Sequence, residues 1–300
     1  MTTVGRWWFA PAPPTRLGIM RILVSGYSLW YLGRRYRMLL RTARADPRLF
    51  QPVGVARVLD RPLPAGAVKA TLLATYTANV AVLLGWQHRF TGPAYSGLLL
   101  WVLTYRNSWS MIYHSGNLPV FHAFVIGVTP AADALSLDGL RRPTPAAPSW
   151  RYGWPLQLIN TVTTATYWLA GVAKVAGPLG WGWAGGEALR SQVLADGLRK
   201  ELLGDGAAPL VSALHGRPGL WRAMAVGSLA AELGAPLALP SRRLAKLWAL
   251  VAFGMHWGIH AIMRIKFRYQ MSGVTFAPFF ELDRLPALLR RLAGRQAIDK

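Results

Sequence analysis

Long apolar runs alternate with short polar and basic stretches along most of the chain. The runs extend over residues 17–33, 70–86, 93–113, 152–173, 220–239 and 247–263. Each is close to the length at which a helix crosses a bilayer, about 20 residues at a rise of about 1.5 Å per residue. The pattern therefore predicts an all-α fold, a polytopic membrane helix bundle of about six to eight spans.

The same runs predict how the chain is divided. We expect one transmembrane domain over residues 17–285. It is preceded by an interfacial segment, residues 1–16, whose consecutive tryptophans and phenylalanine favour the headgroup level. A basic C-terminal tail, residues 286–300, follows. Inside the domain, residues 187–203 predict an amphipathic surface helix, and residues 269–280 form a short apolar segment.

One uncharged stretch contains two histidines between helix breakers. Residues 107–132 include His114 and His122, with Gly116 and Pro119 between them. Glycine and proline both interrupt helices, so this stretch predicts a re-entrant turn or a helix pair at the mouth of a cavity.

Composition and charge support a membrane protein over a nucleic-acid-binding protein. The hydrophobic content is 53 % and the formal net charge is +22. The basic residues lie between apolar runs, without an aromatic-interleaved groove for nucleic acid. Nine of them lie in residues 34–69, against Asp46 and Asp60. We therefore expect a multi-pass protein of the cell membrane with this connection on the cytoplasmic side, where membrane lipid is its partner.

The run 152–173 contains no charged residue and ends at Lys174. The helical spacing places Asn160, Thr164, Tyr167, Gly171 and Lys174 on one face, which is polar or small. That face is expected to look into a protein interior or a cavity and not into lipid.

Two interpretations of Lys174 are open from the spacing alone. The first is a snorkelling lysine at a helix end, with its ammonium group among the lipid headgroups. The second is a partly desolvated lysine that is neutral and acts as a base, because a low dielectric constant disfavours the charged amine.

The residues around Lys174 resemble a known family. The segment from Tyr167 to Lys174 reads Y-W-L-A-G-V-A-K, and a tryptophan-bearing link leads to Gly185, Gly186 and Glu187. This segment resembles the one that carries the catalytic lysine in the vitamin K-dependent gamma-carboxylase family and its bacterial transmembrane relatives. The animal enzyme has two adjacent lysines here. The first is an alanine in this chain, so only Lys174 can take the role.

Two further motifs extend the resemblance. His256 falls where the family carries a functional histidine before its last apolar segment. His114 falls where the family has an Asn-His-Ser element, and S-L-D-G-L at residues 136–140 matches a motif downstream of it. The resemblance covers about residues 17–285. It implies that Lys174, His114 and His256 are catalytic and converge on a cavity.

A cofactor follows from the same resemblance. It implies reduced vitamin K or menaquinol, an isoprenoid quinone, at a site to which Tyr167, Gly171 and His260 would contribute. In the family the lysine deprotonates the hydroquinone and the anion reacts with oxygen. The strong base that results removes a proton from a glutamate side chain, to which carbon dioxide adds.

The histidines His256 and His260 lie one turn apart on a helix with Arg264. Two imidazoles at this spacing can share a metal ion, but no metal is expected because the further ligands are few. The alternatives are a histidine hydrogen-bonded within the bundle and a proton-handling or oxyanion-stabilising role.

The chain ends at residue 300, whereas the animal carboxylases continue into a large extramembrane portion that binds their substrate. The modified group is therefore open between a glutamate side chain of a peptide or protein and another substrate. The alternative function, of another class, is a non-catalytic membrane factor for the maturation or export of a small secreted, toxin-like peptide. A transporter would predict inverted repeats, which are not apparent.

Glu232 lies inside the run 220–239 and needs a counter-charge there. Arg21 and Arg106 are the expected partners, because arginine cannot be neutralised and so requires a permanent anion. If Glu232 paired with Lys174 instead, the lysine would stay protonated, and this would argue against a free lysine base.

Overall fold

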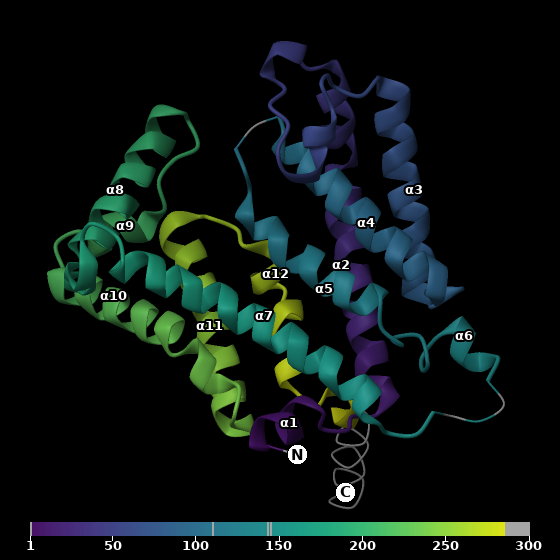
Figure 1. Cartoon of the computed structure of the whole chain (residues 1–300). Helices are drawn as coiled ribbons and strands as arrows, with labels where there is room; N and C mark the ends of the chain where they lie inside the picture. The colour runs from purple at the N-terminus through teal and green to yellow at the C-terminus, as the bar shows by residue number, and fades with distance from the viewer. Residues whose placement is uncertain (1, 110, 143, 145, 286–300) are drawn as a thin grey trace, which may run out of the picture. The chain divides into compact units, whose positions relative to one another are not determined.

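The computed structural model describes residues 2–109, 111–142, 144 and 146–285, and it is shown in Figure 1. These residues form α-helices and short 3₁₀ helices, with no strand among them beyond one isolated bridge between Ala12 and Ser149. The predicted all-α fold is confirmed. The predicted basic tail, residues 286–300, lies outside the described residues.

The chain divides into two compact units. Unit 1 takes in Met1–Ile159 and the C-terminal stretch from Glu281, and unit 2 is Asn160–Phe280. Helix α7, Trp150–Val175, contributes its first turns to unit 1 and the remainder to unit 2.

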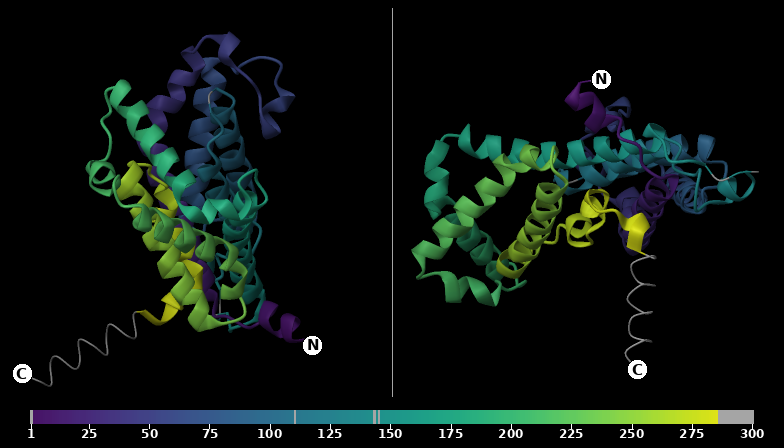
Figure 2. Two further views of the ribbon diagram at one scale, coloured as in Figure 1. Left: turned by 90° about the vertical axis from the view of Figure 1, so that its left-hand side faces the viewer. Right: turned by 90° about the horizontal axis from the view of Figure 1, so that it is seen from below.

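Unit 1 is built on a group of long helices. Its elements are α1 (Thr3–Trp8), α2 (Pro14–Arg41), η1 (Thr42–Arg44), η2 (Pro47–Leu49), η3 (Gly54–Val58), α3 (Ala65–Leu84), α4 (His88–Asn107), η4 (His114–Gly116), α5 (Asn117–Gly127), α6 (Leu137–Leu140) and η8 (Leu282–Arg284). Helix α3 packs on both α2 and α4, and α5 also packs on α2 and α4. The left-hand view of Figure 2 shows the long helices of this unit, coloured purple to teal, running alongside one another.

Helices α4 and α5 approach each other at two glycines. A Cβ atom built on Gly92 would lie 2.2 Å from the carbonyl oxygen of Gly127. Contact this close is possible only without side chains, so the backbones themselves form the interface.

Several predicted helix boundaries differ from the structure. Helix α2 continues to Arg41, past the predicted end at residue 33, because the basic residues that follow are good helix formers and nothing breaks the helix. The described residues of 107–132 do not form the predicted helix pair, and the predicted re-entrant turn stays a prediction. They contain the turn η4 and a single helix, α5, which begins where Pro119 is tolerated in the first turn.

A buried arginine holds one end of unit 1 together. Arg21 is fully buried in α2 and donates hydrogen bonds to four backbone carbonyl oxygens. These belong to Val82 at 2.6 Å, Ala131 at 3.1 Å, Leu83 and Leu135. Two of these carbonyls are at the C-terminal end of α3, where a helix leaves its carbonyls unpaired. Arg21 thus replaces water at a buried helix end.

Asp138 performs the complementary task at the start of α4. Its carboxylate accepts hydrogen bonds from the backbone N–H groups of Gln87 at 2.9 Å and His88 at 2.8 Å. Ser136 caps the short helix that carries Asp138. The S-L-D-G-L motif is therefore a double cap at the α3–α4 turn.

Unit 2 surrounds the second part of α7. Its other elements are η5 (Gly180–Gly185), α8 (Glu187–Leu202), α9 (Pro209–Leu214), α10 (Pro218–Leu233), η6 (Ala235–Ala238), α11 (Arg242–Met263), α12 (Arg268–Met271) and η7 (Val274–Phe279). Helix α11 packs on α8, α9 and α10, and η6 and η7 also lie against it. The amphipathic helix predicted at residues 187–203 is confirmed as α8.

The run predicted as a span at residues 220–239 is not one helix. Helix α10 ends at Leu233, and Pro236 lies in the 3₁₀ turn that follows. Because proline cannot continue an α-helix, the remaining apolar residues fold back as η6. Glu232 is therefore in the last turn of α10 and not at the middle of a span.

Among the described helices, one is both long and apolar enough to cross a membrane by its length and composition. This helix is α3, Ala65–Leu84. The predicted number of six to eight spans stays a prediction, as do the predicted domain boundaries and the orientation.

Replacing Arg21 tests the role of the buried guanidinium group. Arg21→Met should lower the free energy of unfolding by about 3 kcal/mol or more, because four carbonyl groups lose a hydrogen bond from a buried guanidinium group. Thermal unfolding of the purified protein in detergent measures the change. Arg41→Met, on the exposed end of the same helix, is the matched control and should be nearly neutral. Equal melting of the two variants would contradict the proposed role.

Candidate functional site

The polar face of α7 is buried, as its spacing predicts. Asn160, Thr164 and Tyr167 are each less than a tenth exposed. Gly171 follows Tyr167 by four residues on the same face, and Lys174 follows Gly171 by three, close to the C-terminal end of the helix. The face lies against protein in unit 2, where helices α10 and α11 supply its partners.

Lys174 forms an ion pair with Glu232 of α10. Its Nζ atom lies 2.5 Å and 2.6 Å from the two carboxylate oxygens. The Glu232 side chain is 8 % exposed and that of Lys174 is 25 % exposed. Both oxygens are engaged by one ammonium group, so the pair is compact, with a buried carboxylate and a partly exposed lysine side chain.

An indole ring covers the ammonium group. The Nζ atom of Lys174 lies 4.5 Å from the ring centre of Trp183, which belongs to η5. A cation over the face of tryptophan is attracted by the ring quadrupole, so Trp183 stabilises the charged form of the lysine further.

Gly171 allows α10 to approach. A Cβ atom built on Gly171 would lie 2.9 Å from the Cβ atom of Glu232 and 3.0 Å from a methyl group of Leu233. Any larger residue would push α10 away from α7 at the position of the ion pair. Gly171 is therefore needed for helix packing. The contact with a cofactor that the family resemblance implies for Gly171 stays a prediction.

A second polar pair lies one to two turns earlier on α7. The hydroxyl group of Tyr167 is 2.6 Å from Nε2 of His256 in α11. Both side chains are buried, and the ring of Tyr167 packs edge-to-face on Trp248 at 5.1 Å. The Nδ1 atom of His256 is buried without a hydrogen-bond partner among the described residues.

The other predicted site histidines are placed differently. His260 lies one turn after His256 on α11, and its Nδ1 atom is also buried without a partner in the described part of the chain. His114 is exposed in η4 of unit 1, whereas Lys174 and His256 belong to unit 2. The convergence of all three therefore stays a prediction. Within the described ranges, no three His, Cys, Asp or Glu side chains are grouped as metal ligands.

The predicted partners of Glu232 are wrong. Arg21 binds backbone carbonyls, as described above. Arg106 donates to the hydroxyl group of Tyr31 and to the side-chain oxygen of Asn107 at 2.9 Å. The argument that arginine needs an anion fails here because neutral oxygens at helix ends and in side chains satisfy a guanidinium group equally well.

Comparison with known families decides the membership of the chain. The family model of the HTTM domain matches residues 9–283. The chain belongs to the HTTM family. This is the domain of vitamin K-dependent gamma-carboxylase-like membrane proteins, so the predicted resemblance is confirmed. No curated protein and no solved structure matches the chain.

The HTTM match includes both polar pairs of unit 2. The buried set consists of a cation, a carboxylate, a phenol and an imidazole, all contributed by α7, α10 and α11. Such groups can hold, accept and donate protons in a site that is largely buried.

Three residues of this HTTM site were missing from the sequence-based prediction. Trp183 was visible only as part of the tryptophan-bearing link. Trp248 donates its indole N–H to the carbonyl oxygen of Ala231 at 2.8 Å and so holds α11 to the end of α10. Phe276 packs on both Tyr167 and Trp248. The sequence did not identify the aromatic residues of α11 and η7 as part of the site, because their order along the chain does not show which helix they face.

A double-mutant cycle tests the ion pair. Glu232→Gln should lower the free energy of unfolding by about 3–5 kcal/mol, because it leaves the ammonium group without its anion. Lys174→Met combined with Glu232→Leu should recover most of this loss, since two apolar side chains leave no charge unpaired. Melting in detergent reports both. Glu187→Gln, which opens an exposed pair with Arg190, should cost less than about 1 kcal/mol. If the double variant loses as much stability as the sum of the Lys174→Met and Glu232→Leu single variants, the coupling is disproved.

Substitution of Gly171 tests the close approach of the helices. Gly171→Ala should lower the melting temperature clearly, because its methyl group overlaps Glu232 and Leu233. Gly227→Ala is the control on α10, where an added Cβ atom meets nothing within 4 Å. Its melting temperature should stay equal or rise slightly, because alanine favours the helix. If both variants melt like the wild type, the helices are not in contact at Gly171.

Proposed function

We propose that this protein is a hydroquinone-dependent membrane enzyme in which Lys174 and Glu232 act together as one acid–base unit. The observation that carries the proposal is the compact, buried pair itself, with Nζ within 2.6 Å of both carboxylate oxygens. The membership of the HTTM family supports the class of reaction. A free lysine base, as expected from the sequence, is not part of the proposal.

The pair can hold its shared proton in two arrangements. As ammonium and carboxylate, Lys174 is protonated and cannot accept a further proton. As amine and carboxylic acid, both groups are neutral, and burial of the Glu232 side chain favours this arrangement because no charge is then removed from water. The proton is shared between two groups in contact, so the base belongs to the pair and not to either residue.

In the neutral arrangement the Nζ atom of Lys174 has a free electron pair. It can accept a proton from a hydroxyl group brought within hydrogen-bond reach: an O–H bond breaks and an N–H bond forms. The product is an ammonium group beside a carboxylic acid, so the pair gains one positive charge next to the new oxyanion. Trp183 stabilises that ammonium group across its ring face.

The residues fit a hydroquinone. Lys174 and Glu232 together offer a base, because the lysine can be an amine or an ammonium group. Trp183 offers an aromatic face, and His256 has a buried nitrogen without a partner among the described residues. These residues would hold reduced vitamin K or menaquinol by its hydroxyl groups and its ring. When bound, the hydroquinone supplies acidic hydroxyl groups and electrons for reaction with oxygen. The group that is then modified is proposed to be a side chain of a peptide or protein substrate.

A second candidate function is favoured by the same contacts. Lys174 contacts the carboxylate of Glu232 and the ring of Trp183. Such an environment is typical of a lysine that stays charged and holds two helices together. On this view the protein is a non-catalytic membrane factor that assists the maturation or export of a small secreted peptide. The two candidates differ in whether Lys174 must lose its proton.

Lys174→Arg separates the two functions. Arginine retains the ion pair with Glu232, so the melting temperature should change little, but it stays protonated at any accessible pH. If the pair is a base, oxygen-dependent oxidation of menaquinol or reduced vitamin K should fall at least about 100-fold. The assay uses purified protein with and without added peptide. Lys200→Arg is the control, because Lys200 forms a similar pair with Asp196 on α8.

Two outcomes would overturn the enzymatic function. One is a wild-type protein that oxidises no hydroquinone with any peptide. The other is a folded Lys174→Arg variant with full activity in the physiological assay. Either result would leave the helix-pairing role of Lys174 and favour the non-catalytic factor.

A further inference from the structure

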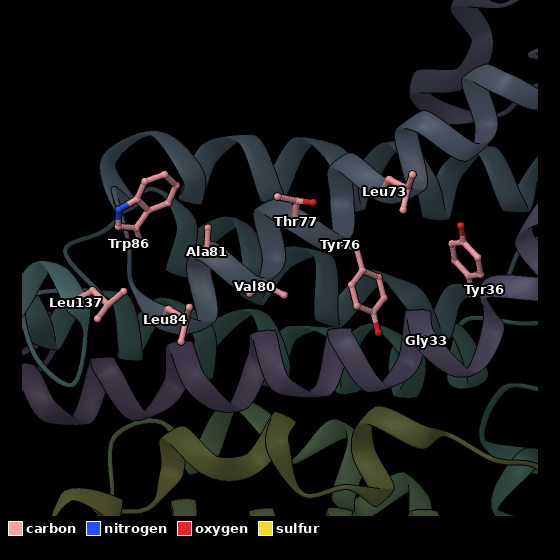
Figure 3. Close-up of a pocket in the computed structure, with 10 residues that line it drawn as sticks. All are labelled: Gly33, Tyr36, Leu73, Tyr76, Thr77, Val80, Ala81, Leu84, Trp86 and Leu137. Atoms are coloured by element: carbon pink, nitrogen blue, oxygen red, sulfur yellow. The ribbon is translucent and has the colours of Figure 1, made fainter.

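An apolar groove lies between α2 and α3 in unit 1 (Figure 3). Its volume is about 820 Å³. Aliphatic side chains of α3, Leu73, Val80 and Leu84, line it together with Thr77, and Tyr36 and Trp86 contribute rings. Figure 3 shows Tyr36 and Leu73 at one end and Leu84 and Trp86 at the other, so the groove follows the helix axes.

Helix α3 carries this groove on a surface that is largely exposed. It is the described helix apolar enough to cross a membrane, yet only 28 % of its most apolar window is buried. Such a surface is stable only in contact with hydrocarbon or another apolar partner. The groove therefore opens toward the acyl chains of a bilayer.

Two cations lie beyond one end of the groove. Arg37 directly follows Tyr36 on α2, and Lys69 precedes Leu73 by one turn on the same side of α3. The helices are antiparallel, since Arg21 near the start of α2 binds the carbonyl oxygen of Val82 near the end of α3. The C-terminal end of α2 and the N-terminal end of α3 are thus neighbours.

Both cations are available for a ligand. Arg37 and Lys69 are exposed, and neither forms an ion pair with any described residue. Neither α2 nor α3 contains an acidic residue. The groove therefore has an apolar body and a positively charged end, with the hydroxyl group of Tyr36 between them.

We propose that this groove binds one acyl chain of an anionic phospholipid, whose phosphate group is held by Arg37 and Lys69. The positive charge at this end of the groove favours an anionic lipid over other lipids. A zwitterionic lipid gains less from two cations without anions nearby, and a neutral isoprenoid has no group for them. The bound lipid fills the groove between α2 and α3 and does not depend on the function proposed for Lys174.

Native mass spectrometry of the delipidated protein in detergent tests the site. Palmitoyl-oleoyl phosphatidylglycerol is added in one series and the corresponding phosphatidylcholine in another. The wild type should bind one phosphatidylglycerol molecule in clear preference. Arg37→Gln with Lys69→Gln should weaken that binding roughly ten-fold or more, since each cation near a lipid headgroup contributes. Arg57→Gln with Arg61→Gln removes the same charge from the exposed connection and should bind as the wild type does.

Filling the groove tests the acyl chain separately. Thr77→Trp, on the exposed floor of the groove, should abolish binding of phosphatidylglycerol, and Val80→Phe is a second substitution of the same kind. Leu100→Trp, exposed on α4 and not among the residues that line the groove, should leave binding intact. A monodisperse elution profile verifies that each variant is folded.

Three results would overturn the proposal. The first is an equal loss of phosphatidylglycerol binding in Arg37→Gln/Lys69→Gln and in Arg57→Gln/Arg61→Gln. This would mean that the net positive charge of the protein, and not these two residues, attracts the lipid. The second is wild-type binding by the folded groove-filling variants. The third is equal binding of phosphatidylglycerol and phosphatidylcholine by the wild type, which would mean that the charged end does not select the ligand.

Discussion

A charge removed from water needs a partner, and this requirement organises both units of the protein. In unit 2 the partner of Lys174 is Glu232, and the pair forms only because α7 and α10 approach within van der Waals contact at Gly171. The ion pair and the glycine therefore depend on each other. Loss of the glycine would separate the charges, and loss of either charge would leave the other buried and uncompensated.

Unit 1 meets the same requirement with different groups. Arg21 is satisfied by backbone carbonyls at the end of α3 and in the connection that follows α5, and Asp138 pairs with the N–H groups at the start of α4. Opposite helix ends are thus capped by a buried cation and a carboxylate, each matching the partial charge of its helix terminus. These charges define the turn between two helices and need no ion pair.

The functional proposal follows from the way in which unit 2 compensates its charge. A lysine paired with a buried carboxylate can exchange one proton within the pair without changing the net charge. The buried Tyr167–His256 pair on the same face of α7 keeps the neighbouring volume polar and ordered. A site of this kind suits proton transfer to or from a hydroxyl group, and its rigidity comes from the aromatic residues around it.

The sequence by itself determined the helical class, the family and the polar face of α7, because these depend on local periodicity and on motifs a few residues long. The sequence also contains a signal for the end of α10, because Pro236 cannot continue an α-helix. The apolar run continues past this proline, and for that reason it predicted a single span. Only the tertiary structure decided the partner of Lys174. Candidate cations and anions lie far apart along the chain, and the choice depends on which helices come close enough. That distance was decided at Gly171, where the absence of a side chain brings Glu232, and not an arginine, into contact.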